Sequence, residues 1–331
     1  CDIVFDFDTL KKDWHNFDEF TEKNYFSVIK EKISNVQEHD ECNNYMGLLE
    51  TLSLNGESWG EPYLLECLPI LMTNIAFPKT QLQAKNTAES IISKMNIYSV
   101  DVVLDLLFSS FDSLKWQTKC GALTILSLLK NIDKSVIQQK IPTIILKLID
   151  VTSDIKKEIK IQTRLCFQEI CSVIDNVDIV KIIPDIIDAY MEPVKYTEKA
   201  LDSLVSTSFI NEVDLSTLGL LIPILTKGMR EKKVAAKRRA ALVIGNMCKL
   251  VNDPRTAHRF YPILKPVLER GIDEIAVEEV RNVCSKSLDT LQRVSSEAAE
   301  ISNSVISTDD LINLIKDNLP NNKENLTLIN H

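Results

Sequence analysis

LIPILTKGM, residues Leu221–Met229, is one of five segments that share one pattern: one or two apolar residues, a proline, and an apolar stretch of helical character. The others are CLPILMTNI (67–75), KIPTIILKLI (140–149), IIPDIIDAY (182–190) and FYPILKPVL (260–268). Pro184, Pro223 and Pro262 are 39 residues apart, and Pro142 precedes Pro184 by 42. SVDVVLDLLFSSF (99–111) fills the 73-residue gap between Pro69 and Pro142, with valine in place of proline. The chain therefore contains an internal repeat of about 40 residues.

Each repeat continues, after a polar turn, into a second segment with helical periodicity. These segments are QLQAKNTAESIISKM, WQTKCGALTILSLL, IKKEIKIQTRLCFQEICSVI, YTEKALDSLVSTSF, VAAKRRAALVIGNMCKLV and VEEVRNVCSKSLDTLQRV. Proline suits the start of the first helix, because its missing N–H is one of the unpaired donors of a first turn. With only 8 glycines and 6% aromatic residues, a strand-rich fold is disfavoured.

A helix pair about every 40 residues is the spacing of HEAT and armadillo repeats, which bury their apolar faces by stacking into a solenoid. We therefore predict an all-α fold, a HEAT-repeat α-solenoid in the form of a right-handed superhelix of stacked helix pairs. Residues 62–294 form six HEAT repeats. Residues 1–61 form degenerate helical cap repeats at the N-terminal end, and residues 295–331 an acidic linker and the start of a following helical region. The first residue is Cys1 rather than Met, so we expect a fragment of a longer chain.

Sequence signatures of catalysis are absent. The chain has no G-x-x-x-x-G-K-[ST] phosphate loop and no G-x-G-x-x-G, G-x-S-x-G or H-E-x-x-H motif. The eight cysteines include no C-x-x-C pair and the four histidines are scattered, so we expect no metal site and no cofactor. Most cysteines occupy apolar positions, which is typical of buried reduced thiols in a cytoplasmic protein. No run of eighteen apolar residues occurs, so we expect no membrane partner.

Positive charge gathers in one segment of this acidic chain, whose formal net charge is -9. The segment Lys227–Arg239 carries seven cations and one acid, a net +6 in thirteen residues, which leaves -15 for the rest. Such polarity suits a protein that meets phosphate at one place. The alternative is that these cations make ion pairs between neighbouring repeats.

A helical wheel divides the cluster into two groups. Val234, Ala241, Ile244 and Cys248 define an inner face, and Arg238 lies about 40° from Val234 at its shoulder. We predict that Arg238 and Lys237 belong to a structural ladder between repeats. Lys232 and Arg239 point to solvent, and Lys227, Arg230 and Lys233 fall in the turn between helices. These five residues are the predicted RNA contacts, with a merely solvated edge as the alternative.

A second cluster, Lys115-Trp-Gln-Thr-Lys119, opens another second helix. Lys115 and Lys119 are further candidates for RNA contact. Trp116 could stack on a base, but we favour a structural role in which it packs across a junction between repeats.

Several of these segments resemble a known family. KWQTKCGAL (115–123), KYTEKALDSLVSTSFINEVD (195–214), LLIPILTKGMREKKVAAKRRAALVIGNMCKLVNDP (220–254) and SLDTLQRV (287–294) resemble the N-terminal HEAT domain of fungal-type translation elongation factor 3. The resemblance runs from about residue 60 to 294 and, more faintly, into VISTDDLINLI (305–315), whereas the first 60 residues match poorly.

This resemblance implies a monomeric, cytoplasmic arm that docks on the ribosome through rRNA and ribosomal proteins. In the family, two ABC cassettes, absent from this chain, hydrolyse ATP with Mg²⁺ and help release E-site tRNA. The chain itself would be no enzyme, although the full-length protein would be an ATPase. Two alternatives stay open. The same run resembles the ribosome-binding coactivator of the amino-acid starvation kinase, and a protein-binding HEAT adaptor would use the cations within its repeats.

Overall fold

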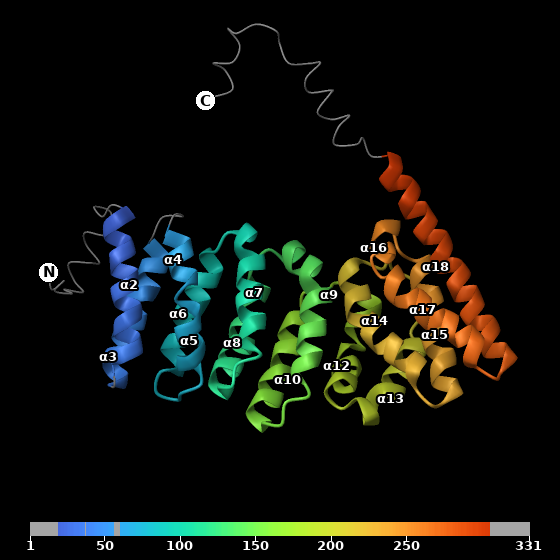
Figure 1. Ribbon diagram of the computed structural model, residues 1–331, viewed down its shortest axis with the longest axis horizontal. Helices are drawn as coiled ribbons and strands as arrows, with labels where there is room; N and C mark the ends of the chain where they lie inside the picture. Colours follow the sequence, from blue (N-terminus) through green and yellow to red (C-terminus); the bar gives the residue numbers. More distant parts are fainter. Residues whose placement is uncertain (1–18, 37, 56–59, 305–331) are drawn as a thin grey trace, which may run out of the picture.

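The computed structural model describes residues 19–36, 38–55 and 60–304, and this part of the chain is a row of antiparallel helix pairs (Figure 1). Its helices are α2 (Glu19–Asn35), α3 (His39–Asn55), α4 (Glu61–Leu65), α5 (Leu68–Ile75), α6 (Gln81–Lys94), α7 (Val100–Ser110), α8 (Trp116–Leu128), α9 (Lys134–Val151), α10 (Lys157–Cys171), α11 (Val177–Val180), α12 (Ile183–Met191), α13 (Pro193–Ser206), α14 (Leu215–Arg230), α15 (Val234–Lys249), α16 (Pro254–His258), α17 (Tyr261–Glu274) and α18 (Glu278–Ser304). Short 3-10 turns, η3 (Ile97–Ser99) and η4 (Leu129–Asn131), extend two of them. Extended pairing within the described residues is limited to one isolated bridge between Val213 and Val251.

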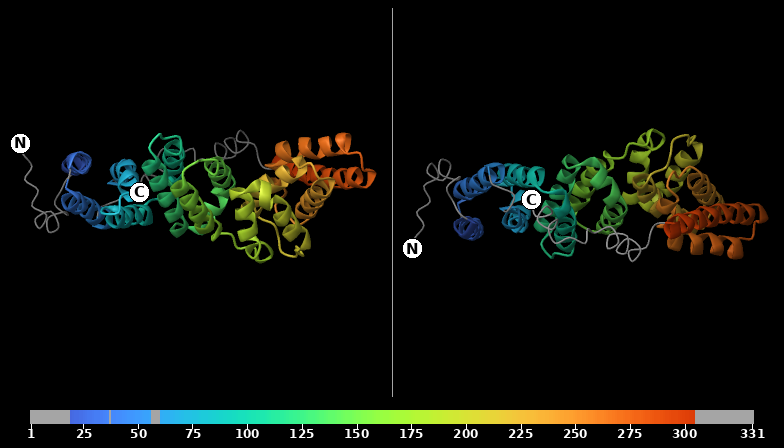
Figure 2. Two further views of the ribbon diagram at one scale, coloured as in Figure 1. Left: turned by 90° about the horizontal axis from the view of Figure 1, so that it is seen from below. Right: turned by 90° about the horizontal axis from the view of Figure 1, so that it is seen from above.

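The helix pairs follow one another along the long axis, as the two views of Figure 2 also show. The turns within the pairs lie along the lower edge of Figure 1, and the connections between pairs lie along the upper edge. One continuous hydrophobic core runs through the stack from Phe26 to Val294. The predicted all-α solenoid is therefore confirmed.

Asp or Asn side chains start several of the first helices. Asp133, Asp214 and Asp253 each accept a hydrogen bond from a backbone N–H of the first turn of α9, α14 and α16. Asn176 does the same for α11. These caps satisfy donors that a helix leaves unpaired, so they fix where the third to sixth repeats begin.

The repeated prolines occupy two different positions, which differs from the expectation of one position at the helix start. Pro69, Pro184 and Pro262 stand in the first turn of α5, α12 and α17, and in each case a short separate helix precedes that turn. Pro142 and Pro223 lie inside α9 and α14. The third to sixth repeats all have an Asp or Asn cap upstream of the proline, but only in α9 and α14 does the helix run from that cap through the proline without a break.

Two glycines permit unusually close contacts between repeats. A Cβ on Gly121 of α8 would lie 1.9 Å from the backbone oxygen of Met72 in α5. A Cβ on Gly219 of α14 would lie 2.8 Å from the Cα of Pro142 in α9. The second contact joins the first helices of the third and fifth repeats directly, past the short helices of the fourth repeat.

The two ends of the solenoid relate differently to the predicted domains. Helices α2 and α3 form a helix pair that precedes the six predicted repeats, and residues 1–18 of the expected cap lie outside the described residues. At the other end, α18 continues through the expected boundary at 294 to Ser304. This extension is anchored because Ala298 is buried and the Ser295 hydroxyl lies 2.8 Å from Nδ1 of His258. Residues 305–331, the rest of the expected linker, lie outside the described residues.

Candidate nucleic-acid interface

The basic segment occupies the end of α14, the turn after it and the start of α15. Lys227 and Arg230 belong to the last turn of α14 rather than to the turn between the helices. There they face the negative end of the helix dipole, which favours cations. Lys232 and Lys233 are exposed in the turn. Val234, expected on the inner face, is 36% exposed, because the first residue of α15 extends beyond the helices that cover its later turns.

Three cations of the segment form ion pairs with neighbouring repeats. Lys233 Nζ lies 2.7 Å from a carboxylate oxygen of Glu198, and Arg239 Nε lies 2.8 Å from one of Asp202, both in α13. On the other side, Arg238 donates to Glu279 of α18 at 2.8–2.9 Å. Arg239, expected to point freely to solvent, is thus tied to the preceding repeat. Arg238 makes the kind of inter-repeat contact that a ladder requires.

Ion pairs of this kind recur elsewhere in the solenoid. Lys119 pairs with Asp154, Lys130 with Glu169, and Lys134 with Asp175, and their partners are 35 to 41 residues apart in sequence. That separation equals one repeat, so each pair joins equivalent parts of adjacent repeats. Most of these side chains are well exposed, and such pairs contribute about 0–1 kcal/mol each.

Four cations of the segment remain without an ion pair to any described residue: Lys227, Arg230, Lys232 and Lys237. Lys237 therefore differs from the expectation of a ladder contact. It lines a small cavity with Arg230 and Arg270, and the one acid there, Glu274, pairs with Arg270 at 3.8 Å. Arg270 escaped sequence reasoning, although it follows Arg230 by 40 residues, one repeat period.

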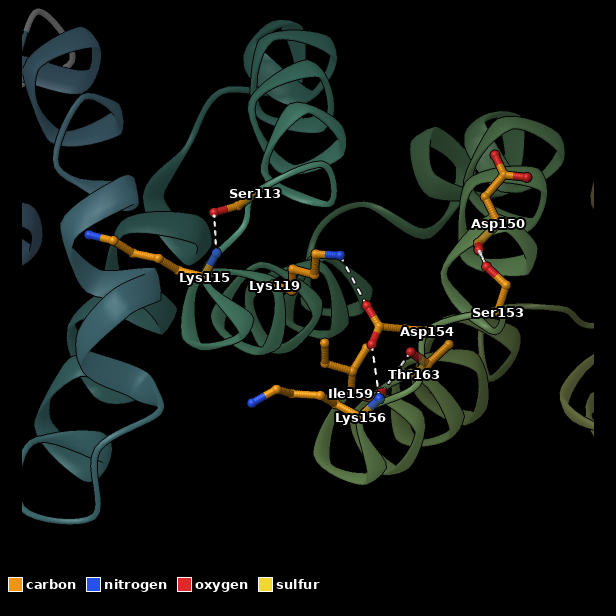
Figure 3. A network of polar contacts seen from close by, with 9 residues as sticks. All are labelled: Ser113, Lys115, Lys119, Asp150, Ser153, Asp154, Lys156, Ile159 and Thr163. Carbon is orange, nitrogen blue, oxygen red and sulfur yellow. Dashed lines mark hydrogen bonds and ion pairs between the residues drawn. The ribbon is translucent and has the colours of Figure 1, made fainter.

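The second predicted cluster is held within the repeat stack (Figure 3). Lys119 Nζ donates to Asp154 at 3.0 Å, and both side chains are about one-fifth exposed. Asp154 also accepts from the backbone N–H of Lys156 at 3.0 Å. The ring of Trp116 is partly buried against the core, with Lys156 Nζ 5.0 Å from its centroid. Lys115 is exposed and its side chain points away from Asp154.

The charged groups of this second cluster interact with one another, as structural contacts between repeats do. The N–H of Lys156 and the ammonium of Lys119 lower the pKa of Asp154. Burial raises the pKa of Cys120 to about 11 and that of Cys67, Cys166 and Cys248 to about 12, which keeps these thiols protonated.

Across residues 19–36, 38–55 and 60–304 no group of three or more His, Cys, Asp or Glu side chains could hold a metal ion. In the same part of the chain, no helix combines the length and apolar character needed to cross a membrane.

Two family models match the chain. The model described as the EF3 N-terminal HEAT repeat covers residues 13–167, and that described as the elongation factor 3/GNC1 HEAT repeat covers residues 195–302. The sequence similarity to this family thus begins near residue 13. The motifs alone had indicated a start near residue 60. The second model contains the whole basic segment.

Curated relatives agree with these models. Elongation factor 3 of Pneumocystis carinii is 34% identical over 84% of the chain, and elongation factor 3A of Saccharomyces cerevisiae is 32% identical over 71%. The eIF-2-alpha kinase activator GCN1 of Saccharomyces cerevisiae is 28% identical over 77% of the chain. The chain spans about a quarter of the length of these elongation factors, 27% and 23%, and 9% of GCN1.

Among solved structures, Kap121p bound to Nup53p aligns with 93% of the chain at 15% identity and a TM-score of 0.45. This structural likeness is distant.

Proposed function

This chain belongs to the HEAT-repeat family of translation elongation factor 3, and from that premise we propose that it is a ribosome-docking arm. It contacts rRNA and ribosomal proteins in the cytoplasm. ABC cassettes elsewhere in the full-length protein bind ATP and Mg²⁺ and drive the release of E-site tRNA. The arm itself performs no catalysis, holds no cofactor and acts as a monomer.

The observation that carries the proposal is a group of four cations at the α14–α15 junction that have no ion pair to a described residue. We call Lys227, Arg230, Lys232 and Lys237 the free-cation group. Phosphate contacts dominate the affinity of proteins for nucleic acids, because each neutralised phosphate releases bound counterions. The neighbouring Lys233, Arg238 and Arg239, which we call the scaffold cations, form ion pairs with acids of the adjacent repeats. The free-cation group thus lies on helices that pack into the core, and such a preorganised surface suits docking to a folded RNA.

Relatives of the GCN1 type support a second candidate. The family model over residues 195–302 carries the names of both proteins, and GCN1 is similar over 77% of this chain. In this alternative the chain is part of a ribosome-binding coactivator that activates an eIF-2-alpha kinase. The sequence downstream of residue 331 decides between them: two phosphate-loop cassettes support the elongation factor, and further HEAT repeats support the coactivator.

Co-sedimentation of the chain with purified fungal ribosomes tests the proposal. We expect pelleting at about 100 mM salt that declines steeply as salt rises. Lys232→Glu combined with Arg230→Glu should abolish pelleting while leaving helicity unchanged. Arg230 is preferred to Arg239 here because Arg239 also holds Asp202.

The matched control is Lys94→Glu with Lys160→Glu, which makes the same change in net charge. Both lysines are exposed, and neither has an ion pair among the described residues. Equal loss of pelleting in the two variants would mean that only net charge matters, and the assignment of the surface would then be wrong.

A further inference from the structure

The cavity beside the free-cation group is lined by cations from three different helices. Arg230 ends α14, Lys237 lies in the first turn of α15, and Arg270 lies in α17 of the next repeat. We call this place the cation niche. Its apolar walls are Met229 and Val267.

The charges that line the niche are not balanced by ion pairs among the residues that the structure describes. The one carboxylate that lines it, Glu274, faces Arg270 across 3.8 Å, the outer range for an ion pair, with both side chains 63% exposed. Arg230 and Lys237 have no ion pair to a described residue. The charged side chains that line the niche, three cations and one carboxylate, therefore sum to a net charge of about +2.

Helix dipoles explain only one of these cations. Arg230 stands at the end of α14, where the dipole favours a positive charge. Lys237 lies at the opposite, unfavourable end of α15, whose first turn has no acidic residue. Arg270 is not in the last turn of α17. Arg270 does pair with Glu274 one turn on in its own helix, so Lys237 is the cation of the niche whose position helix stability does not explain.

The size of the cavity limits what can enter it. Its volume is about 20 Å³, and a space of about 10–15 Å³ on this measure holds one water molecule. A nucleotide or another small metabolite does not fit. One oxygen of a phosphate group does, provided that the rest of the ligand lies on the surface outside.

We infer that the cation niche binds one phosphodiester of an RNA backbone that runs across the α14–α15 and α17 surface, with Arg270 as an additional contact residue. Arginine suits this role because its planar guanidinium can donate two hydrogen bonds to one phosphate. The inference rests on the proposed function and deepens it, since it places a specific phosphate between the fifth and sixth repeats.

The test measures binding of the chain to a fluorescein-labelled 20-base-pair RNA hairpin by anisotropy, between 50 and 200 mM KCl. The variant is Arg270→Gln. Loss of one phosphate contact should reduce the slope of log K against log salt by about 0.7–0.9, which is about five- to eightfold in affinity per tenfold change in salt.

The control variant is Arg293→Gln in α18. Arg293 is also 63% exposed and also pairs with an acid four residues on, Glu297 at 3.5 Å, but it lies outside the niche. Its slope should equal that of the unmodified chain. An Arg270→Gln slope no different from that of Arg293→Gln would overturn the niche and leave the proposed function intact. Failure of the unmodified chain to bind the hairpin at 50 mM KCl would overturn both.

A second arm distinguishes a backbone phosphate from a free anion. Inorganic phosphate should displace the hairpin no better than KCl of equal ionic strength, because a free anion lacks the neighbouring backbone phosphates that the rest of the free-cation group binds. If phosphate displaces the hairpin more strongly than KCl does, and this excess disappears in Arg270→Gln, the niche binds a free oxyanion. That result would overturn its assignment to RNA.

Discussion

Gly121→Ala is the substitution that most severely tests the stacking of the repeats. The new Cβ would lie 1.9 Å from the backbone oxygen of Met72 and 2.4 Å from its Cα, whereas ordinary contacts are 3.4–4 Å. Since backbone atoms cannot rotate away, α8 must withdraw from α5 by about 1.5 Å. A gap of 0.5–1 Å already forfeits a quarter to a half of a dispersion contact. Overpacking costs about 1–3 kcal/mol, and we expect the upper end here.

Gly47→Ala is the matched control. Gly47 also lies in a helix, α3, but its nearest neighbour would be the flexible Gln83 side chain at 3.6 Å. There the alanine should stabilise the helix by about 1 kcal/mol, because it removes the conformational freedom of glycine.

Thermal unfolding followed by circular dichroism at 222 nm measures both variants. About 2 °C per kcal/mol applies to chains of this size, so Gly121→Ala should melt several degrees below the unmodified chain and Gly47→Ala about 2 °C above it. Equal melting temperatures for the two variants would refute the close contact between α5 and α8.

Three further predictions concern the scaffold. Arg239→Gln should lower the free energy of unfolding by less than about 1 kcal/mol in urea titrations, because its pair with Asp202 is partly exposed to solvent; a loss above 3 kcal/mol would contradict this. The folded-state pKa of Asp154 is lowered, so its contribution to stability is present above the ordinary aspartate pKa of about 3.9 and is lost as pH falls through the lower folded value. Asp154→Asn should therefore flatten the fall in melting temperature between about pH 5 and 3, and an unchanged profile would count against the contact. Cys67, Cys166 and Cys248 should react with iodoacetamide at pH 8 only in denaturant, as mapped by mass spectrometry, because burial raises their pKa to about 12; rapid labelling of the native chain would show that they are accessible.

The repeat architecture could be predicted from sequence because a 40-residue period is a strong signal that needs no detailed geometry. The residues at which the helices start were harder to predict from the sequence. Proline at the first turn is a good general expectation, and it holds for α5, α12 and α17. It was wrong for Pro142 and Pro223, where the helix runs from the caps Asp133 and Asp214 through the proline without a break.

The candidate site was predictable in its location but not in its pairing. The excess of cations between Lys227 and Arg239 is visible in the sequence. A helical wheel describes one helix, whereas Asp202 and Glu279 come from the helices on either side of α15. The wheel therefore assigned Arg239 to solvent and could not find Arg270. A search for opposite charges one repeat apart would reduce the number of possible ion-pair partners. The side-chain geometry of the structure then shows which of them pair.

The division between free and scaffold cations is the central claim, and one comparison on ribosomes tests it most directly. One variant neutralises two free cations, Arg230→Gln with Lys232→Gln. The other removes a whole scaffold pair without changing net charge, Arg239→Gln with Asp202→Asn. We predict that the first loses co-sedimentation at about 100 mM salt and the second retains it. Retained binding by the first variant together with lost binding by the second would contradict the account.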